Sequence, residues 1–136
     1  MSVVFWLFVI TVAVFLVLDA LMLTRVLAPL FETYIGEIMR PQPLYGAAAL
    51  FYVAYIAGLV WLVSWPAFVA GTPGDALVKG AVVGALAYGT YEFTNMATLK
   101  LWSWKMVALD LAWGTVLTGV SAWAGVALLR LGLRMV

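Results

Sequence analysis

Long apolar segments alternate with short polar breaks along this chain of 136 residues. Four segments are each long enough to cross a hydrocarbon core, which takes about 20 helical residues. They cover residues 3–24, 45–65, 76–98 and 105–129, with breaks at 41–43, 71–75 and 100–105. Aromatic side chains gather near the ends of these segments, as they do at membrane–water interfaces. The pattern predicts a single domain over residues 1–136 with four membrane-spanning helices.

A shorter amphipathic segment lies in the connection between the first two predicted spans. Between residues 29 and 40 the apolar side chains recur at i, i+3 and i+4, and polar side chains fall between them. Pro29 suits a first helical turn, and Pro41 ends the run. A helix of this length is too short to cross a membrane, so we expect it to lie in the interface. The predicted fold class is all-α: a polytopic membrane four-helix bundle with a short interfacial helix in the first loop.

Composition agrees with a lipid environment. The chain is 67% hydrophobic and 10% charged, with a mean hydropathy of +1.13, whereas soluble domains are about 45–50% apolar and about 25% charged. Cys and His are absent, which excludes disulfides, thiolate nucleophiles and the usual zinc sites. We therefore expect no metal and no cofactor. The formal net charge of +1 provides no basic surface for nucleic acid.

Three carboxyl groups lie inside the predicted spans: Asp19, Glu92 and Asp110. On insertion scales each costs about 2.5–3.5 kcal/mol at a helix centre and less near an end. Successive helices run in opposite directions, which places all three acids at a similar depth beneath the side that carries the first and third connections. Arg25, Lys100 and Lys105 rim that side, and the opposite half of the bundle is almost wholly apolar. The sequence thus predicts a closed-ended polar vestibule lined by carboxyl groups.

The spacing around the acids identifies candidate ligand-binding residues. Tyr88 and Asn95 flank Glu92 at i−4 and i+3, and Trp113 follows Asp110 at i+3, where its indole N–H can donate to the acid. Asp19 has only apolar neighbours at these spacings, so its partner must come from elsewhere. The candidate set is Asp19, Tyr88, Tyr91, Glu92, Asn95, Lys100, Asp110 and Trp113.

These residues are compatible with three kinds of function. A vestibule with aromatic walls and a few convergent polar groups is typical of a site that binds or transports a small amphipathic or lipid-like ligand. The same polar groups could instead join helices within an accessory or structural subunit that works with a second copy or another membrane protein. Paired carboxyl groups could also serve an enzyme as general acid and base, although no nucleophile–base pair is visible. A channel is disfavoured because the apolar half offers no polar path.

The segment from Tyr88 to Lys100 reads YGTYEFTNMATLK, and Trp102, Lys105, Asp110 and Trp113-Gly114-Thr115 follow it. With Asp19, this pattern resembles an uncharacterised family of small four-helix bacterial membrane proteins, a domain of unknown function, over essentially the whole chain. Glu92 and Ser103 stand where the family pattern commonly has Asp and Pro. The resemblance implies the four-helix fold and the bacterial inner membrane, and it favours lipid or an apolar metabolite as ligand. It supplies no reaction.

Orientation depends on how the cations are counted. Lys79, Arg130 and Arg134 lie on the side of the termini, and Arg25, Arg40, Lys100 and Lys105 on the other. If the nearby carboxyl groups neutralise Arg25, Lys100 and Lys105, the positive-inside rule places the termini in the cytoplasm.

Overall fold

The computed structural model describes residues 2–136, and within them it is helical with no strand. Helix α1 (Val3–Met22) passes through a π-helical turn, η1 (Leu23–Leu27), into α2 (Ala28–Ile35) and a 3-10 turn, η2 (Gly36–Ile38). Helix α3 (Tyr45–Leu59) continues through a second π-helical turn, η3 (Val60–Ser64), into α4 (Trp65–Ala70). Helices α5 (Pro73–Thr98) and α6 (Trp104–Arg134) complete the chain.

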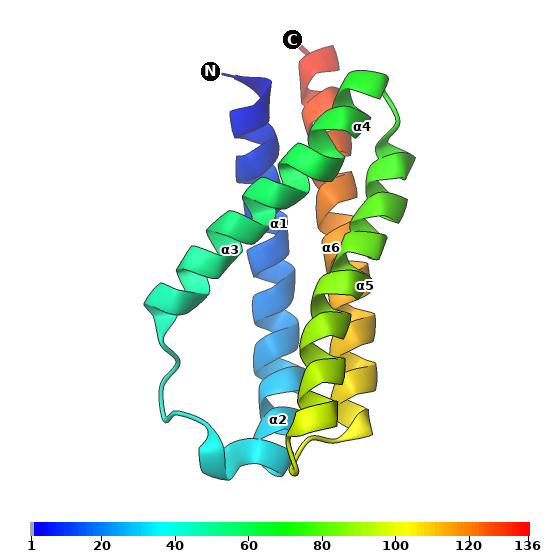
Figure 1. The fold of residues 1–136 in the computed structure, drawn as a ribbon. Coiled ribbons are helices and arrows are strands. Elements are labelled where there is room, and N and C mark those ends of the chain that lie inside the picture. Colours follow the sequence, from blue (N-terminus) through cyan, green and yellow to red (C-terminus); the bar gives the residue numbers. More distant parts are fainter. Residues whose placement is uncertain (1) are drawn as a thin grey trace.

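The helices form an up-and-down bundle with both chain ends at the same end of the molecule (Figure 1). Helices α1, α5 and α6 stand nearly parallel to one another, whereas α3 crosses the bundle obliquely. Its first half diverges from the other helices, and its large side chains there are exposed, with Leu50 at 74%. The segment after η1 turns across the far end of the bundle. The all-α four-helix fold predicted from the hydropathy pattern is confirmed.

Three continuous helices are long and apolar enough to cross a membrane: Val3–Ile38, Tyr45–Ala70 and Trp104–Arg134. Helix α5 has 26 residues, also a sufficient length, but it is more polar and includes Asp75, Lys79 and Glu92. It coincides with the predicted span 76–98 and packs along α6. That α5 crosses the membrane stays a prediction.

The π-helical turns explain two differences between the predicted and observed elements. In η1 the Ala28 N–H bonds to the carbonyl of Leu23, and in η3 the Trp65 N–H bonds to that of Val60. A proline follows each turn, Pro29 and Pro66. Proline has no N–H, and its ring collides with the carbonyl four residues earlier, so a locally wider turn lets the helix continue. The interfacial helix is therefore continuous with α1, and the second predicted span runs on to Ala70 instead of ending at 65.

Glycines bring α5 and α6 into close contact. A Cβ at Gly80 would lie 3.0 Å from the Cα of Gly119, and one at Gly119 would lie 2.7 Å from the carbonyl oxygen of Leu77. A Cβ at Gly84 would meet the carbonyl oxygen of Gly114. The Gly80–Gly84 pair thus acts as a helix-packing motif, as small residues four apart do in membranes.

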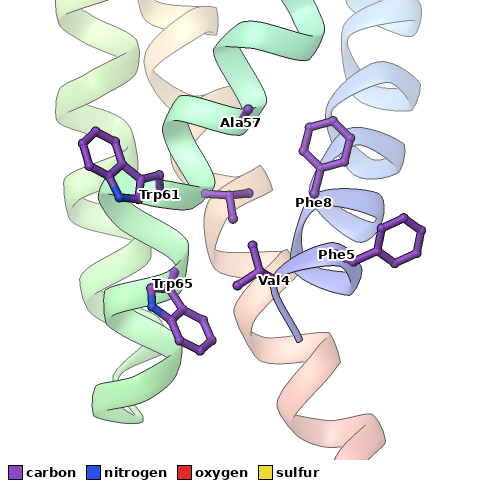
Figure 2. A pocket seen from close by; sticks show the side chains of 7 residues that line it. Val4, Phe5, Phe8, Ala57, Trp61 and Trp65 are labelled. Atoms are coloured by element: carbon purple, nitrogen blue, oxygen red, sulfur yellow. The ribbon is translucent and has the colours of Figure 1, made fainter. Parts of the chain in front are cut away.

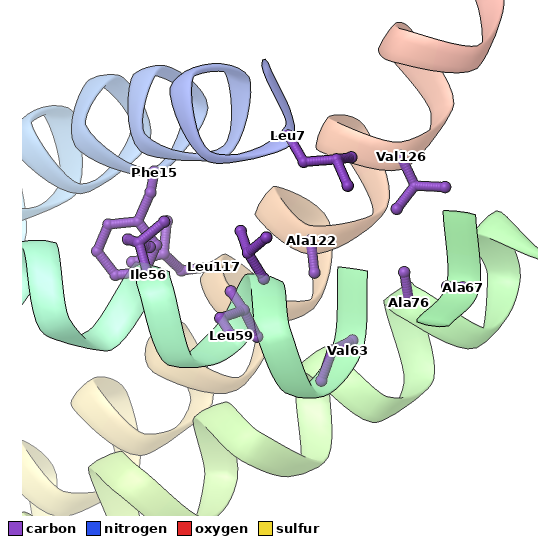
Figure 3. Close-up of a cluster of buried hydrophobic side chains, with 11 residues drawn as sticks. Leu7, Phe15, Ile56, Leu59, Val63, Ala67, Ala76, Leu117, Ala122 and Val126 are labelled. Carbon is purple, nitrogen blue, oxygen red and sulfur yellow. The ribbon is translucent and has the colours of Figure 1, made fainter. Parts of the chain in front are cut away.

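A hydrophobic core fills the half of the bundle nearer the termini (Figure 3). Phe15 of α1 lies beside Ile56 of α3 and Leu117 of α6, and Leu7 of α1 lies towards Val126 of α6. A second, smaller cluster joins Ile35 of α2 to Trp102, Met106 and Val107, which fixes the segment after η1 against the start of α6. Together the two clusters hold the polar groups between them.

Candidate functional site

Asp19 joins three helices through neutral hydrogen-bond donors. Its carboxyl group is 6% exposed. The Tyr52 hydroxyl of α3 donates to Oδ2 at 2.7 Å, and the Trp113 indole N–H of α6 donates to Oδ1 at 3.1 Å. Both oxygens therefore have a partner, and α1, α3 and α6 meet at this one side chain.

Glu92 is more deeply buried and less well satisfied. Its exposed fraction is 0%, and its Oε2 accepts a 2.7 Å hydrogen bond from the Trp102 indole N–H. Its Oε1 has no hydrogen-bond donor among the described residues. Asp110 is 8% exposed, and its carboxyl group neighbours that of Glu92. A buried oxygen without a donor is costly, so a shared proton or a donor from another molecule is needed here.

Tyrosines fill the space between the acids and the hydrophobic core. The Tyr55 and Thr118 hydroxyls lie 2.9 Å apart, and the ring of Tyr52 packs edge-on against Phe15. Tyr88 lies near Asp19 and covers Gly114, where a Cβ would collide with its ring. The polar layer is thus bounded by aromatic rings on its core side.

The remaining candidates lie farther from the acids or towards the surface. Tyr91 is 51% exposed and packs edge-on against the Trp102 ring, and Asn95 follows it one turn later on α5. Lys100 is exposed in the connection between α5 and α6. The recorded hydrogen bonds of Asp19 and Glu92 come from Tyr and Trp, not from a cation.

The structure corrects two expectations about this layer. Trp113 donates to Asp19 on α1 and not to Asp110 on its own helix, because helix packing carries the indole across to the neighbour. The acids are nearly fully covered at 6%, 0% and 8%, so they form a buried layer and do not line the closed-ended vestibule that the sequence predicts.

Sequence reasoning missed two functional neighbours, Tyr52 and Trp102. Neither was expected to contact an acid, since aromatic residues near span ends are usually interfacial anchors. In the structure each is a hydrogen-bond donor to a buried acid. The hydroxyl of Tyr52 and the indole N–H of Trp102 mark both residues as possible hydrogen-bond donors. Spacing within one helix, however, does not predict which residues on different helices pair.

The surface has two grooves, one beside the polar layer and one away from it. None of the three acids lines either groove. The larger, about 410 Å³, lies near the N-terminal end between α1 and the η3 region, with Phe8, Trp61 and Trp65 in its lining (Figure 2). The smaller, about 270 Å³, lies between α1 and α6 and includes Arg25 and Trp113. Within residues 2–136, no three acidic side chains are grouped closely enough to hold a metal ion.

Fold, apolar surface and a buried polar layer together define a small polytopic helical membrane protein. A family model described as "Predicted membrane protein (DUF2177)" matches residues 4–127. The chain therefore belongs to this family of membrane proteins, and the bilayer is its environment. Searches of curated proteins and of solved structures find no match.

Proposed function

We propose that this protein binds, or carries across the membrane, a small amphipathic or lipid-like ligand whose polar group reaches the buried acids. The observation that carries the proposal is the unpartnered Oε1 of Glu92 beside Asp110. A buried carboxyl oxygen in a layer that served only to join helices would be expected to find a donor within the protein, and beside Glu92 only a proton shared with Asp110 can provide one. A ligand bearing a hydroxyl or ammonium group would supply the missing donor.

The surroundings of the layer suit a ligand that also has an apolar part. Aromatic rings border the acids, and the first half of α3, which carries Tyr52, is sparsely covered by the other helices. The remaining candidate residues, Tyr88, Tyr91, Asn95 and Lys100, stay predictions as contacts of that ligand.

Glu92→Gln tests the proposal. The amide oxygen can still accept from Trp102, but an NH₂ group in place of Oε1 cannot accept a hydrogen bond from a ligand. The protein would be purified from its native membrane in mild detergent. Small molecules that co-purify would then be extracted from it and identified by mass spectrometry. We expect one amphipathic compound with the wild type and with the exposed control variant Glu37→Gln, and a strong loss with Glu92→Gln. Equal recovery from all three proteins, or none from the wild type, would contradict the proposal.

An accessory or structural role is the second candidate, and Asp19 favours it. Both oxygens of Asp19 are satisfied by side chains of α3 and α6, as expected for a residue that joins helices. In this case Glu92→Gln would leave small-molecule content unchanged, and the protein would co-purify in fixed ratio with another membrane protein.

Placement in a bacterial inner membrane with cytoplasmic termini also remains a proposal. Its premise was that carboxyl groups neutralise Arg25, Lys100 and Lys105. All three cations are exposed, and the recorded donors to Asp19 and Glu92 are Tyr and Trp. Reporter fusions at both chain ends test the proposed orientation directly.

A further inference from the structure

The groove between α1 and α6 combines one cation with an apolar wall. It is a shallow, open groove of about 270 Å³, lined by Leu18, Leu21, Met22, Arg25, Val26 and Trp113. Small-molecule pockets usually begin at roughly 300 Å³. A headgroup and the first part of one chain can lie in the groove, and the rest of the lipid would extend along the helix surface.

The position of Arg25 matches the level of lipid phosphates. Val3 and Arg25 are separated by 22 residues in a nearly continuous helix, which corresponds to a rise of about 33 Å. A hydrocarbon core is about 30 Å thick. If α1 spans the bilayer from Val3, Arg25 reaches the opposite headgroup region, and Leu18 lies about 10 Å deeper along the same groove.

The two ends of the groove carry different chemistry. The Arg25 guanidinium is exposed, and both oxygens of the nearest acid on its own helix, Asp19, are occupied by Tyr52 and Trp113. A guanidinium presents a planar set of N–H donors that matches a phosphate group. Below it, Leu18 and Leu21 offer only apolar surface.

Trp113 forms the other wall and is held in place. Its indole N–H bonds to Asp19, which fixes the ring between α1 and α6. The bond turns the polar atom of the ring towards the acid and leaves the carbon framework to line the groove. A rigid aromatic wall favours contact with an acyl chain, since little side-chain freedom is lost on binding.

We infer that this groove is a site for an anionic phospholipid, whose phosphate binds Arg25 and whose acyl chain lies along Leu18, Leu21 and Trp113. The site is separate from the Glu92–Asp110 pair, so either assignment can fail without the other. Its ligand is anionic at the polar end, whereas the Glu92 site calls for a hydrogen-bond donor.

Native mass spectrometry of the purified, detergent-solubilised protein tests the inference. The probes are phosphatidylglycerol and phosphatidylcholine with identical chains, and glycerol 3-phosphate as a headgroup without chains. We expect the wild type to retain phosphatidylglycerol over phosphatidylcholine, and Arg25→Gln to lower that retention by about tenfold. The matched control Arg40→Gln, an exposed arginine outside the groove, should retain it as the wild type does.

Three further results would decide the matter. Met22→Trp, which fills the groove and keeps Arg25, should also lower phosphatidylglycerol retention, whereas Glu92→Gln should not. Glycerol 3-phosphate should not compete, since the chain contributes part of the affinity. The inference is overturned if Arg25→Gln and Arg40→Gln lower retention equally, if phosphatidylcholine is retained as well as phosphatidylglycerol, or if glycerol 3-phosphate displaces the lipid.

Discussion

At the scale of single residues, the buried acids differ in how well the protein satisfies them. Asp19 has a donor for each oxygen, whereas Glu92 has a donor for only one. A fully satisfied buried acid stabilises the arrangement of helices around it, and an incompletely satisfied one is a place where another molecule can bind. We therefore propose that Asp19 mainly joins helices and that Glu92 and Asp110 contact the ligand.

Tyr52→Phe should destabilise the bundle by about 1–3 kcal/mol, because it leaves Oδ2 of buried Asp19 without its donor. The exposed control Tyr45→Phe should change stability little. Unfolding by titration with a denaturing detergent would measure both. In an Asp19→Asn background, Tyr52→Phe should cost clearly less than in the wild type. An equal cost in both backgrounds would show that the hydrogen bond does not account for the loss.

The sequence predicted which residues are polar and buried, but not which of them pair. Membrane depth follows from position along a helix, so Asp19, Glu92 and Asp110 could all be placed near one level. Which residues pair also depends on how each helix is rotated about its axis. A single sequence reveals side-chain neighbours only within the same helix. This is why Trp113 was expected beside Asp110 and instead donates to Asp19, and why Tyr52 and Trp102 were overlooked as donors.

At the scale of elements, α5 and α6 form the tightest pair and α3 the loosest part of the bundle. A Cβ at Gly80, Gly84 or Gly119 would press against the facing helix, and Gly114 makes room for the Tyr88 ring. Around Gly46 and Gly58 of α3, in contrast, a Cβ would have nothing within 4 Å. Movement of the bundle on ligand entry should therefore involve α3, while the α5–α6 pair stays fixed.

Gly84→Ala should lower the free energy of unfolding by about 1–3 kcal/mol, because the added methyl group collides with the Gly114 backbone and with Thr118. Gly58→Ala is the matched control in open space, and helix propensity predicts no loss, or a gain of up to about 1 kcal/mol. The same detergent titration compares the two variants. If Gly84→Ala were as stable as Gly58→Ala, the close packing of α5 on α6 would be refuted.

Element boundaries were less predictable than the elements themselves. Apolar segments of about 20 residues identify the helices reliably, since each must satisfy its backbone internally in lipid. Pro29 was interpreted as the first turn of a separate first-loop helix, and the second span was predicted to end at 65. The π-helical turns before Pro29 and Pro66 absorb the prolines, and a hydropathy pattern gives no sign of such a turn.

At the scale of the whole molecule, the even number of long helices places both ends of the chain on one side (Figure 1). Reporter fusions at each end should therefore report the same compartment, and the proposed orientation predicts the cytoplasm. A reporter that fluoresces only in the cytoplasm, paired with one active only outside it, would measure both ends. Activity outside the cytoplasm at both ends would reverse the orientation, and opposite results at the two ends would mean that α5 does not cross the membrane.

The molecule as a whole divides into two parts: a core nearer the termini whose buried polar groups are hydroxyls (Thr11, Ser64, Thr118 and Ser121), and a layer of carboxyl groups nearer the far end. This arrangement disfavours a continuous polar path and favours a site reached from one side or from the lipid. The central claim of our account is that Glu92 and Asp110 bind a donor group from a molecule other than the protein.

The most direct test is a high-resolution crystal structure of the protein purified with its native membrane components. We predict non-protein density larger than a water molecule, with a donor atom within hydrogen-bonding distance of the Glu92 Oε1 and an apolar part directed towards α3. The same crystals of Glu92→Gln should lack this density. A structure in which Oε1 bonds only to Asp110 or to a single water, with no other density in the layer, would contradict the claim.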